Sequence, residues 1–451
     1  MFTDSLVLIS AVTVMFAYLW NSYYNREMEF KPFVLKGTLL LTVLYAVIFI
    51  LFSMAFGGFK VGYSYPSGLV GSQAISLIST NAVTYLQISL IARELMPLVP
   101  LLLLTAAEIA VGVIWSVAST FIYRKIFPAR KMVVVYGKRD SSDLVVKMSR
   151  RMDKYIICSS ISCEEDIEDI KKKILEYEAV IICDVPLEKR AKLLKFAFEN
   201  SIRTYISPKI SDIIVRGADE FHMFDTPLLL ARNQGLSVEQ LFIKRFFDIL
   251  LSAIGIIISS PFMLIIALLI KIYDGGPVFY CQNRYTKDRE VFRLIKFRSM
   301  VVDAEKDGVA RLAADDDSRI TPVGKFLRSC RLDELPQLFN ILVGSMSFVG
   351  PRPERPEIAQ QYEKVMPEFA YRLRVKAGLT GFAQVFGKYN TTPYDKLKLD
   401  LMYIERHSFA LDLRIMLMTF KTMFVPDATE GIKDGETAMP KDTTDPDEDE
   451  K

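Results

Sequence analysis

The sequence FFDILLSAIGIIISSPFMLIIALLIKI occupies residues 246–272 and is the longest apolar block after residue 125. Lys244 and Arg245 precede it, and Lys271 lies near its end. Its middle contains Ser260 and Pro261. A proline inside a helix removes one backbone hydrogen bond and clashes with the preceding turn, so this block is predicted to be a kinked helix. Neighbouring serine hydroxyls can satisfy the freed carbonyls even in lipid.

The kink bears on whether this block crosses a membrane. Each half has about 13 residues and rises only about 20 Å, less than the roughly 30 Å of a hydrocarbon core. We therefore expect a re-entrant helix over residues 246–272, broken at Ser260 and Pro261, that enters and leaves by the same face. The alternative is an ordinary kinked transmembrane helix, which would place everything after Tyr273 on the opposite side.

Further apolar segments lie in residues 1–125 and predict a transmembrane bundle of about four helices. Residues 6–20, 38–56 and 98–122 are apolar enough to span a membrane, whereas residues 74–91 are interrupted by polar side chains. A basic cluster that begins at Arg124 places the end of the last helix in the cytoplasm. Four spans would leave the basic residues between 26 and 36 outside, against the positive-inside tendency. Three spans would place them inside, with residues 74–91 in the interface or packed within the bundle; we favour four spans.

Residues 131–228 alternate between short apolar runs and charged helical segments. This alternation predicts a Rossmann-like α/β domain, with strands at 132–136, 155–159, 179–183 and 204–206 in a doubly wound parallel sheet. The first turn, residues 137–140, contains a single glycine, Gly137, and lacks the three-glycine dinucleotide fingerprint. Lys138 and Arg139 could still meet a phosphate, but we favour a structural or oligomerisation role.

Composition limits the remaining classes of chemistry. The 451-residue chain has five cysteines without a paired metal-ligand spacing and two histidines, so a histidine metal site or a Ser-His-Asp triad is not expected. The net charge is +3, with a basic body that suits phosphates or a membrane surface, and no nucleic-acid partner is expected. Residues 427–451 are acidic and nearly free of apolar residues, which predicts a disordered tail.

An ordered series of motifs follows the apolar block, within a predicted catalytic domain of residues 237–425. The motifs are Gly276-Pro277-Val278-Phe279, Gln282-Asn283-Arg284, Phe292–Met300, Ser318–Arg328, Arg331–Leu338, Gly350–Pro356 and Gly378-Leu379-Thr380-Gly381. Together they closely resemble the bacterial polyprenyl-phosphate sugar-1-phosphate transferase family over residues 244–424. The membrane bundle and the α/β domain resemble the long form of that family. One departure is Ala377, where the family commonly has proline.

The pair Asp333-Glu334 is the strongest candidate for catalysis. Carboxylates act as nucleophiles in covalent phosphoryl transfer, and they also hold Mg²⁺. If the pair opens a helix with Pro336 in its first turn and an apolar stripe of Leu335, Leu338, Phe339 and Leu342, the two side chains point about 100° apart at a helix N-terminus. The alternative is that Asp333 is only an N-cap. The resemblance implies that Asp333 is the nucleophile and that Glu334 is the partner of Mg²⁺ or Mn²⁺.

Several basic residues are candidates for substrate binding. Arg352 and Arg355 lie in a proline-rich loop and are assigned to the nucleotide diphosphate, against the alternative of surface pairing with Glu354 and Glu357. Lys296 and Arg298 alternate along a predicted strand and either line the site or form its solvated face. The resemblance adds Asp400 and Tyr403 as candidates. Asp315-Asp316-Asp317 is interpreted as a solvated loop.

The resemblance implies an enzyme of the bacterial inner membrane with its catalytic domain facing the cytoplasm. It would transfer a sugar-1-phosphate from a UDP-sugar to polyprenyl (undecaprenyl) phosphate through a phosphosugar-aspartate intermediate, and so initiate exopolysaccharide, capsule or O-antigen repeat units. The alternative from another class is a non-catalytic membrane regulatory protein whose α/β domain senses a ligand. A CDP-alcohol phosphotransferase would need several aspartates on one transmembrane helix, and none of the apolar segments has them. The sugar is not predicted, and a homodimer is left open.

Overall fold

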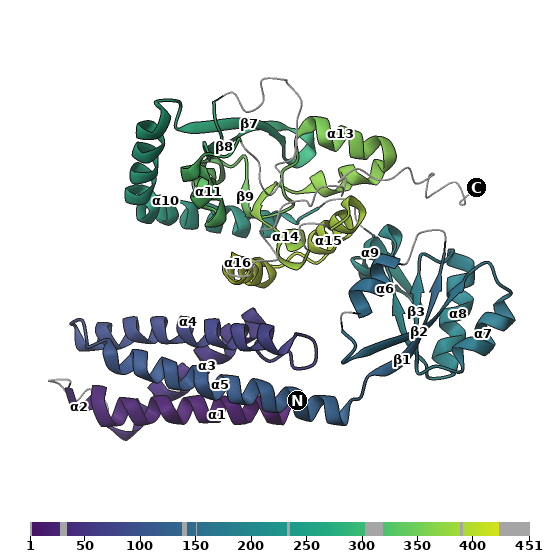
Figure 1. The fold of residues 1–451 in the computed structure, drawn as a ribbon, viewed down its shortest axis with the longest axis horizontal. Coiled ribbons are helices and arrows are strands. Elements are labelled where there is room, and N and C mark those ends of the chain that lie inside the picture. The colour runs from purple at the N-terminus through teal and green to yellow at the C-terminus, as the bar shows by residue number, and fades with distance from the viewer. Residues whose placement is uncertain are drawn as a thin grey trace. The chain divides into compact units, whose positions relative to one another are not determined.

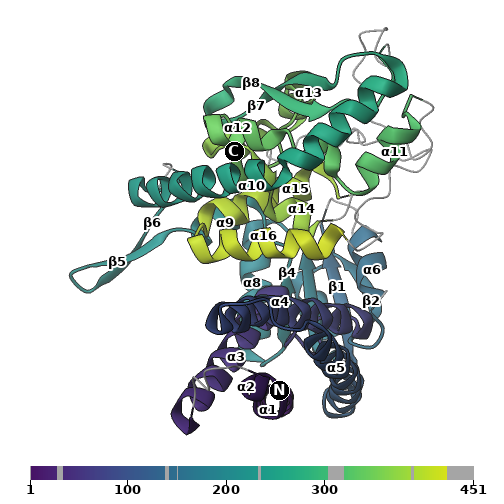
Figure 2. The ribbon, with the colours of Figure 1, turned by 90° about the vertical axis from the view of Figure 1, so that its left-hand side faces the viewer.

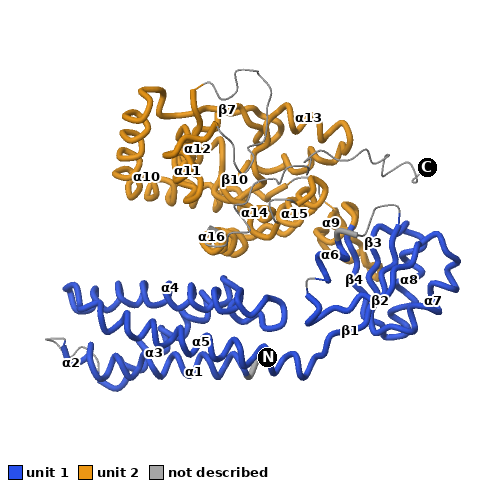
Figure 3. The backbone as a smooth tube through the Cα atoms, in the orientation of Figure 1, with its two compact units in different colours: residues 1–208 blue, residues 209–451 orange. Residues whose placement is uncertain are grey.

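The computed structural model describes residues 2–27, 34–137, 142–149, 151–231, 235–302, 319–387 and 391–423 of the chain. The chain forms two compact units, residues 1–208 (unit 1) and residues 209–451 (unit 2), which are described separately (Figure 3). The predicted acidic tail and Asp315-Asp316-Asp317 lie outside the described residues.

Four long helices form the amino-terminal part of unit 1 (Figure 1). They are α1 (Phe2–Leu19), α3 (Leu35–Phe56), α4 (Pro66–Ala92) and α5 (Val99–Ile126), and α1 continues through a π-helical turn, η1 (Trp20–Tyr24), into the short α2 (Asn25–Glu27). Each long helix is of sufficient length and apolar character to cross a membrane. Large side chains, among them Phe16, Trp20 and Phe49, pack in their shared core. The weaker segment, residues 74–91, lies within α4, so the helix predicted there is present.

The polar residues that weakened the prediction for α4 lie on its buried face. Ser72, Ser76, Thr80 and Thr84 follow one another at four-residue spacing, and each is fully buried. Each hydroxyl donates to the carbonyl four residues earlier, at 2.7–2.8 Å. Because these small side chains satisfy their own polar groups, α4 packs closely against its neighbours without losing hydrogen bonds to water.

The loop between α3 and α4 contacts the α/β part of unit 1. Arg151 donates to the carbonyl of Tyr63 at 2.8 Å, and Asp153 of the same turn pairs with Arg124 of α5 at 3.3 Å. The α3–α4 loop and the carboxyl end of α5 therefore meet the same turn. If α1, α3 and α5 cross a membrane, α4 must cross it as well, because three spans would put the Tyr63 loop and Arg151 on opposite sides.

The α/β part of unit 1 is built on a four-stranded parallel sheet. Its strands are β1 (Arg130–Tyr136), β2 (Tyr155–Ser162), β3 (Ala179–Cys183) and β4 (Arg203–Ile206), in the order β2-β1-β3-β4, and all four were predicted. Alternate side chains of β1 pack on opposite faces. Val133 and Val135 share a core with α7 (Ile167–Ile174) and α8 (Leu187–Glu199), whereas Met132 and Val134 pack with α6 (Ser142–Ser149).

Gly137, the single glycine of the first turn, serves a close approach of two chain segments. A Cβ atom at this position would lie 1.9 Å from the carbonyl oxygen of Asp184, so a larger residue cannot fit. Lys138 and Arg139, the candidates for phosphate contact in this turn, lie outside the described residues. The glycine therefore has a structural reason that needs no nucleotide.

Unit 2 begins before the predicted catalytic domain. Helix α9 (Ile210–Arg216) packs against α15 (Pro393–Glu405), and Ile213 belongs to the same core as Leu236. The antiparallel strands β5 (Asp219–Met223) and β6 (Thr226–Leu230) follow, and all ten of their residues are exposed; Figure 2 shows this hairpin projecting as a narrow ribbon. The sequence places α9, β5 and the start of β6 in the α/β domain, whereas in the structure unit 2 begins at Lys209 and includes them.

The rest of unit 2 arranges short elements around one long helix, α10 (Val238–Asp274). A two-stranded antiparallel sheet of β7 (Phe279–Tyr285) and β8 (Val291–Phe297) follows, joined by η2 (Lys287–Arg289). Strands β9 (Ser347–Val349) and β10 (Gly378–Thr380) form a parallel pair. The other elements are α11 (Pro322–Ser329), η3 (Leu332–Glu334), α12 (Gln337–Val343), α13 (Pro356–Val365), η4 (Pro367–Arg374), α14 (Phe382–Phe386) and α16 (Phe409–Met423).

Helix α10 contains Pro261 in its interior, and Figure 1 shows two arms that meet at a bend. Pro261 cannot donate to the carbonyl of Ile257, four residues earlier. The hydroxyl of Ser260 donates to that carbonyl instead, at 2.9 Å, and Ser259 donates to the carbonyl of Gly255 at 2.6 Å. The predicted compensation of the proline by its neighbouring serines is therefore confirmed.

Candidate active site

Asp333 and Glu334 lie in a short 3-10 turn, η3, and do not open an α-helix as expected. Helix α12 begins only at Gln337, after Pro336. Because Pro336 has no N–H to donate to the carbonyl of Leu332, the α-type bond is missing there, and Leu335 donates to Leu332 at 3.3 Å instead. The predicted helix N-terminus at the carboxylates is therefore wrong.

Two further details of α12 differ from the prediction. Its buried apolar residues are Leu338 and Ile341, whereas Phe339, which was placed in the apolar stripe, is 40% exposed. The N-cap position of α12 is Pro336, which forms no side-chain capping bond. Asp333 is thus not the N-cap of this helix, and that structural explanation for its presence is removed.

Glu334 is held by basic side chains. Its Oε1 lies 2.8 Å from Nζ of Lys296 and 3.9 Å from Nη2 of Arg352. Burial alone would raise the pKa of Glu334, but the charges of Lys296 and Arg352 and the Lys296 hydrogen bond lower it to about 2. Glu334 is therefore ionised at neutral pH, and Lys296 and Arg352, both predicted site residues, lie beside it.

Asp333 has a different environment from its neighbour. Its side chain is almost fully buried, and burial raises the pKa of its carboxyl above the ordinary value; the Lys296 charge opposes this shift and the Glu334 charge adds to it. A poorly solvated carboxylate is a stronger nucleophile than one in water. The two adjacent carboxyls thus have pKa values displaced in opposite directions, a pattern typical of sites with divided roles.

Asn340 fixes the strand that carries Lys296. Its side-chain oxygen accepts from the backbone N–H of Ile295 at 3.0 Å, and its Nδ2 donates to the carbonyl of Arg293 at 2.9 Å. Helix α12 therefore holds β8 in register beside η3. Sequence reasoning missed Asn340, although a buried amide on an otherwise apolar face of a helix is a signal for such a bond.

Arg298, a predicted site residue, is directed away from the carboxylate pair. It pairs with Asp274 at the end of α10, with Nη1 2.6 Å from Oδ2, and its Nε donates to the carbonyl of Pro277 at 2.7 Å. This residue ties the carboxyl end of α10 to β8 and is 7% exposed. Asp274, which the motif series did not single out, is its partner.

The loop that carries Arg352 is fixed by close backbone packing. A Cβ atom at Gly350 would lie 2.3 Å from the carbonyl oxygen of Lys376, and Gly350 donates to the carbonyl of Thr380 at 2.9 Å. Ala377, where a proline was expected, donates its N–H to the hydroxyl of Thr286 at 3.3 Å, a bond that proline cannot form. Arg355, the other predicted arginine of this loop, occupies the N-cap position of α13.

Asp400 lies behind this loop and not on its surface. It is 1% exposed, and its Oδ2 lies 2.7 Å from Nη2 of Arg372. Arg372 in turn donates to the carbonyl of Arg352 at 3.1 Å. Burial raises the pKa of Asp400 to about 6, against the opposing charge of Arg372. The structure therefore places Asp400 as a support for the Arg352 loop, through an arginine that sequence reasoning missed.

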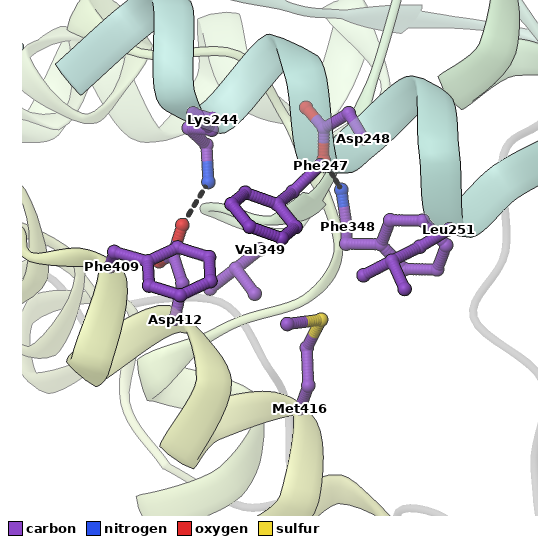
Figure 4. A pocket seen from close by; sticks show the side chains of 9 residues that line it. All are labelled: Lys244, Phe247, Asp248, Leu251, Phe348, Val349, Phe409, Asp412 and Met416. Atoms are coloured by element: carbon purple, nitrogen blue, oxygen red, sulfur yellow. Dashed lines mark hydrogen bonds and ion pairs between the residues drawn. The ribbon is translucent and has the colours of Figure 1, made fainter. Parts of the chain in front are cut away.

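The first arm of α10 is attached to α16 and to β9 by buried charges (Figure 4). Nζ of Lys244 lies 2.6 Å from Oδ2 of Asp412 and 3.1 Å from the hydroxyl of Tyr403. Asp248 accepts from the N–H of Phe348 at 3.0 Å and from the hydroxyl of Ser347 at 3.1 Å. Tyr403, a candidate from the resemblance, is thus 1% exposed and positions β9 and α16.

The carboxylate pair has the donor type that a divalent cation prefers. Mg²⁺ is usually held by one or two carboxylates together with substrate phosphates and water. Glu334 is ionised and 16% exposed, which fits that arrangement. Within the described ranges no group of three or more histidine, cysteine, aspartate or glutamate side chains could form a cage made of protein alone. The site thus fits a cation that is shared with a phosphate substrate.

Comparison with known proteins places this geometry in context. Residues 239–426 match the family model for bacterial sugar transferases. The chain is 44% identical over 185 residues to a UDP-N-acetylgalactosamine-undecaprenyl-phosphate N-acetylgalactosaminephosphotransferase of Aeromonas hydrophila, a match that covers 40% of this chain and 44% of that protein. It is 32% identical over 334 residues to the galactosyl transferase CpsE of Streptococcus agalactiae serotype III, covering 67% of this chain and 74% of that protein.

A shorter relative separates the two units of the molecule. The exopolysaccharide production protein PSS of Rhizobium leguminosarum bv. phaseoli is 38% identical over 188 residues, which are 40% of this chain but 94% of that protein. For the Aeromonas protein and two other relatives, the match spans only about half of the relative's length, 44–54%. The family match and the candidate site both fall in unit 2. By these matches the chain belongs to the bacterial sugar transferase family.

Proposed function

We propose that this protein transfers a sugar-1-phosphate from a UDP-sugar to undecaprenyl phosphate, as the names of its relatives describe for them. The observation that carries the proposal is the arrangement around η3: a buried Asp333 beside an ionised Glu334, with Lys296 and Arg352 at 2.8 and 3.9 Å from the latter. Lys296 and Arg352 can offer positive charge to the oxygens of a diphosphate, while Asp333 remains to attack phosphorus.

The proposed reaction has two displacement steps. A carboxylate oxygen of Asp333 attacks the β-phosphorus of the UDP-sugar, and the bond from that phosphorus to the bridging oxygen breaks. UMP leaves with the bridging oxygen, and the sugar-phosphate remains as an acyl phosphate on Asp333. An oxygen of undecaprenyl phosphate then attacks the same phosphorus, which frees the carboxylate and gives undecaprenyl-diphospho-sugar. No proton transfer is required, since each departing oxygen leaves as an anion.

Roles for the other residues follow from their positions. Arg352 is about half exposed, so its guanidinium can turn from Glu334 to the phosphate oxygens of the donor. Lys296 stabilises the charge that develops on the leaving phosphate. Glu334 would hold Mg²⁺ or Mn²⁺ together with the substrate phosphates, and the cation would supply charge neutralisation for the diphosphate when bound. Asp400 contributes through Arg372 and the Arg352 loop.

The membrane placement is part of the same proposal. Because UDP-sugars are cytosolic, the site must face the cytoplasm of a bacterial inner membrane. We propose that α10 enters and leaves by that face, with its bend at Ser260 and Pro261 inside the bilayer. Only 11% of the most apolar 18-residue stretch of α10 is buried inside the protein, which supports contact of its remaining surface with lipid.

The test of the proposed function is UMP release. Purified full-length protein mixed with a panel of UDP-sugars, Mg²⁺ and undecaprenyl phosphate should release UMP with at least one sugar and form the matching lipid product. A well-folded preparation that releases no UMP with any sugar of the panel would contradict the proposal and favour a non-catalytic role.

A further inference from the structure

Basic side chains gather around the backbone of residues 352–354. Arg284 of β7 donates from Nη1 to the carbonyl of Pro353 at 3.1 Å, and Arg372 donates to the carbonyl of Arg352 at 3.1 Å. Lys396 lies on α15 one helical turn before Asp400, the partner of Arg372. We call the four basic side chains of Arg284, Arg352, Arg372 and Lys396 the loop cation cluster.

The loop cation cluster has more positive than negative charge. Two of its neighbouring carboxylates, Asp400 and Glu354, pair with Arg372, at 2.7 and 3.5 Å. Arg284 bonds only to neutral acceptors, the carbonyl of Pro353 and the side-chain oxygen of Gln282 at 2.5 Å. The side-chain ammonium of Lys396 forms no ion pair or hydrogen bond with another residue of the described ranges; its backbone N–H donates to the carbonyl of Thr392 at 2.9 Å. Glu334, 3.9 Å from Arg352, is a third neighbouring carboxylate, so the four cations exceed the carboxylates by one charge.

Holding these cations together lowers the pKa values of Arg284 and Lys396. Burial lowers the pKa of Arg284 to about 10, and the charges of Arg352 and Arg355 act in the same direction. Burial also lowers the pKa of Lys396, and Arg372 and Arg352 add to that effect. Cations held together against repulsion and desolvation are stabilised when an anion joins them.

We infer that Arg284 and Lys396 bind the phosphate that stays with the nucleoside, so that the nucleoside monophosphate leaving group lies against residues 352–354. The inference rests on the proposed function and extends it to two residues outside the carboxylate pair. Arg352 connects the carboxylate pair with the loop cation cluster, because its Nη2 lies 3.9 Å from Glu334 while its carbonyl oxygen accepts from Arg372. The two phosphates of a nucleoside diphosphate are adjacent, so one meets the carboxylate pair and the other the cluster.

Lys396→Met tests this inference in the full-length protein, because Lys396 holds no other described residue in place. We expect it to raise both the KM for the UDP-sugar and the dissociation constant of UMP by about tenfold or more, with the KM for undecaprenyl phosphate nearly unchanged. The matched control is Lys398→Met, two residues further along α15, where the ammonium pairs with Asp395 at 3.2 Å. That control should leave both nucleotide constants as they are.

The outcomes separate this inference from the proposed function. UMP binding that is equal in Lys396→Met and the parent protein would overturn the inference while leaving the reaction intact. A rise in the KM for undecaprenyl phosphate alone would also overturn it, because the bound phosphate would then be that of the lipid. Failure of the parent protein to release UMP would contradict the proposed function itself.

Discussion

Both units of this molecule bury carboxylates, and they surround them with different partners. In the bundle of unit 1, Glu108 accepts from the hydroxyl of Tyr45 at 2.8 Å and from the amide of Asn81 at 2.7 Å, both neutral donors. In unit 2, Glu334 lies beside the cations Lys296 and Arg352. Neutral donors satisfy a carboxyl and lock three helices together. Cations keep a carboxylate charged and bring with them the positive charge that a phosphate needs.

The two units also differ in how far protein covers their apolar helices. Helix α4 of unit 1 is less apolar than α10 of unit 2. Protein buries 39% of the most apolar 18-residue stretch of α4, but only 11% of the corresponding stretch of α10. The less apolar helix is thus the better covered by protein. The hydroxyls on the buried face of α4 bond within their own helix, whereas most of the apolar surface of α10 is not covered by protein. Changes in the two units should therefore have different consequences.

The largest effect is expected at the unit 2 carboxylates. Asp333→Asn should lower kcat by about a thousandfold or more, because it removes the nucleophile. It should also raise the midpoint of thermal unfolding, because burial has raised the pKa of Asp333 and the charged form is therefore disfavoured in the fold. Steady-state UMP release and thermal unfolding measure the two effects. A variant that keeps a tenth of parental turnover would exclude Asp333 as the nucleophile.

Glu334→Gln should change stability in the opposite direction. The pKa of Glu334 is lowered from 4.5 to about 2, so its charge stabilises the fold above pH 4.5 and loses that contribution as the pH falls toward 2. The shift corresponds to about 3 kcal/mol, which the variant forgoes at neutral pH. Thermal unfolding of the parent and Glu334→Gln proteins at pH 7 gives the comparison. Equal midpoints would contradict the ion pairs with Lys296 and Arg352.

A smaller but still large loss is expected when the bend in α10 is removed. Replacement of Ser260 by Ala and Pro261 by Leu should straighten residues 246–272 into about 40 Å of helix, long enough to span a bilayer, so part of the protein inverts its active site and turnover falls severalfold. Native Cys281 and Cys158, both exposed, serve as single labelling sites after and before α10. An impermeant thiol reagent applied to spheroplasts should miss both in the parent and reach Cys281 in the variant. Labelling of Cys281 but not Cys158 in the parent would rule out re-entry.

The ion pair of Lys244 and Asp412, which joins α10 to α16, should affect stability more than chemistry. Asp412→Leu leaves Lys244 buried without its carboxylate and removes partners of Tyr403 and His407, so we expect a loss of about 3–5 kcal/mol. Lys244→Met should cost less, because Asp412 keeps its two other partners. Combining both should cost less than their sum. Denaturant unfolding in detergent measures the free energy of unfolding of the parent, the two single variants and the double variant. Strictly additive losses would show that Lys244 and Asp412 are not coupled.

The smallest effect is expected in unit 1. Glu108→Gln keeps an acceptor for Tyr45 at the carbonyl oxygen of the new amide, so UMP release should stay within about twofold of the parent. Glu108→Gln makes the same chemical change as Glu334→Gln, but in unit 1 instead of unit 2. A large loss of turnover would show that the bundle participates in the reaction and would remove the contrast between the units.

Sequence reasoning located the carboxylate pair and the helices because both depend on local pattern. Uninterrupted apolar segments predict α1, α3 and α5, and the position of Pro261 directly after two serines predicts the bend of α10. It misplaced details that depend on contacts between distant residues. Lys244 and Asp412 are 168 residues apart, and Asp274 and Arg298 are 24 apart. The partners of Asp400 and Arg298 therefore could not be deduced from spacing, nor could the 3-10 turn at Asp333.

The central claim is that Asp333 carries the sugar-phosphate between donor and lipid, and one measurement tests it most directly. Parent protein, UDP-sugar and Mg²⁺ are mixed without undecaprenyl phosphate, and UMP release is followed on the time scale of one turnover while the protein is analysed by mass spectrometry. The account predicts a burst of UMP that approaches one per active site, with a phosphosugar mass on the peptide containing Asp333, and neither signal from Asp333→Asn. UMP release that waits for the lipid, with an unmodified peptide throughout, would contradict it.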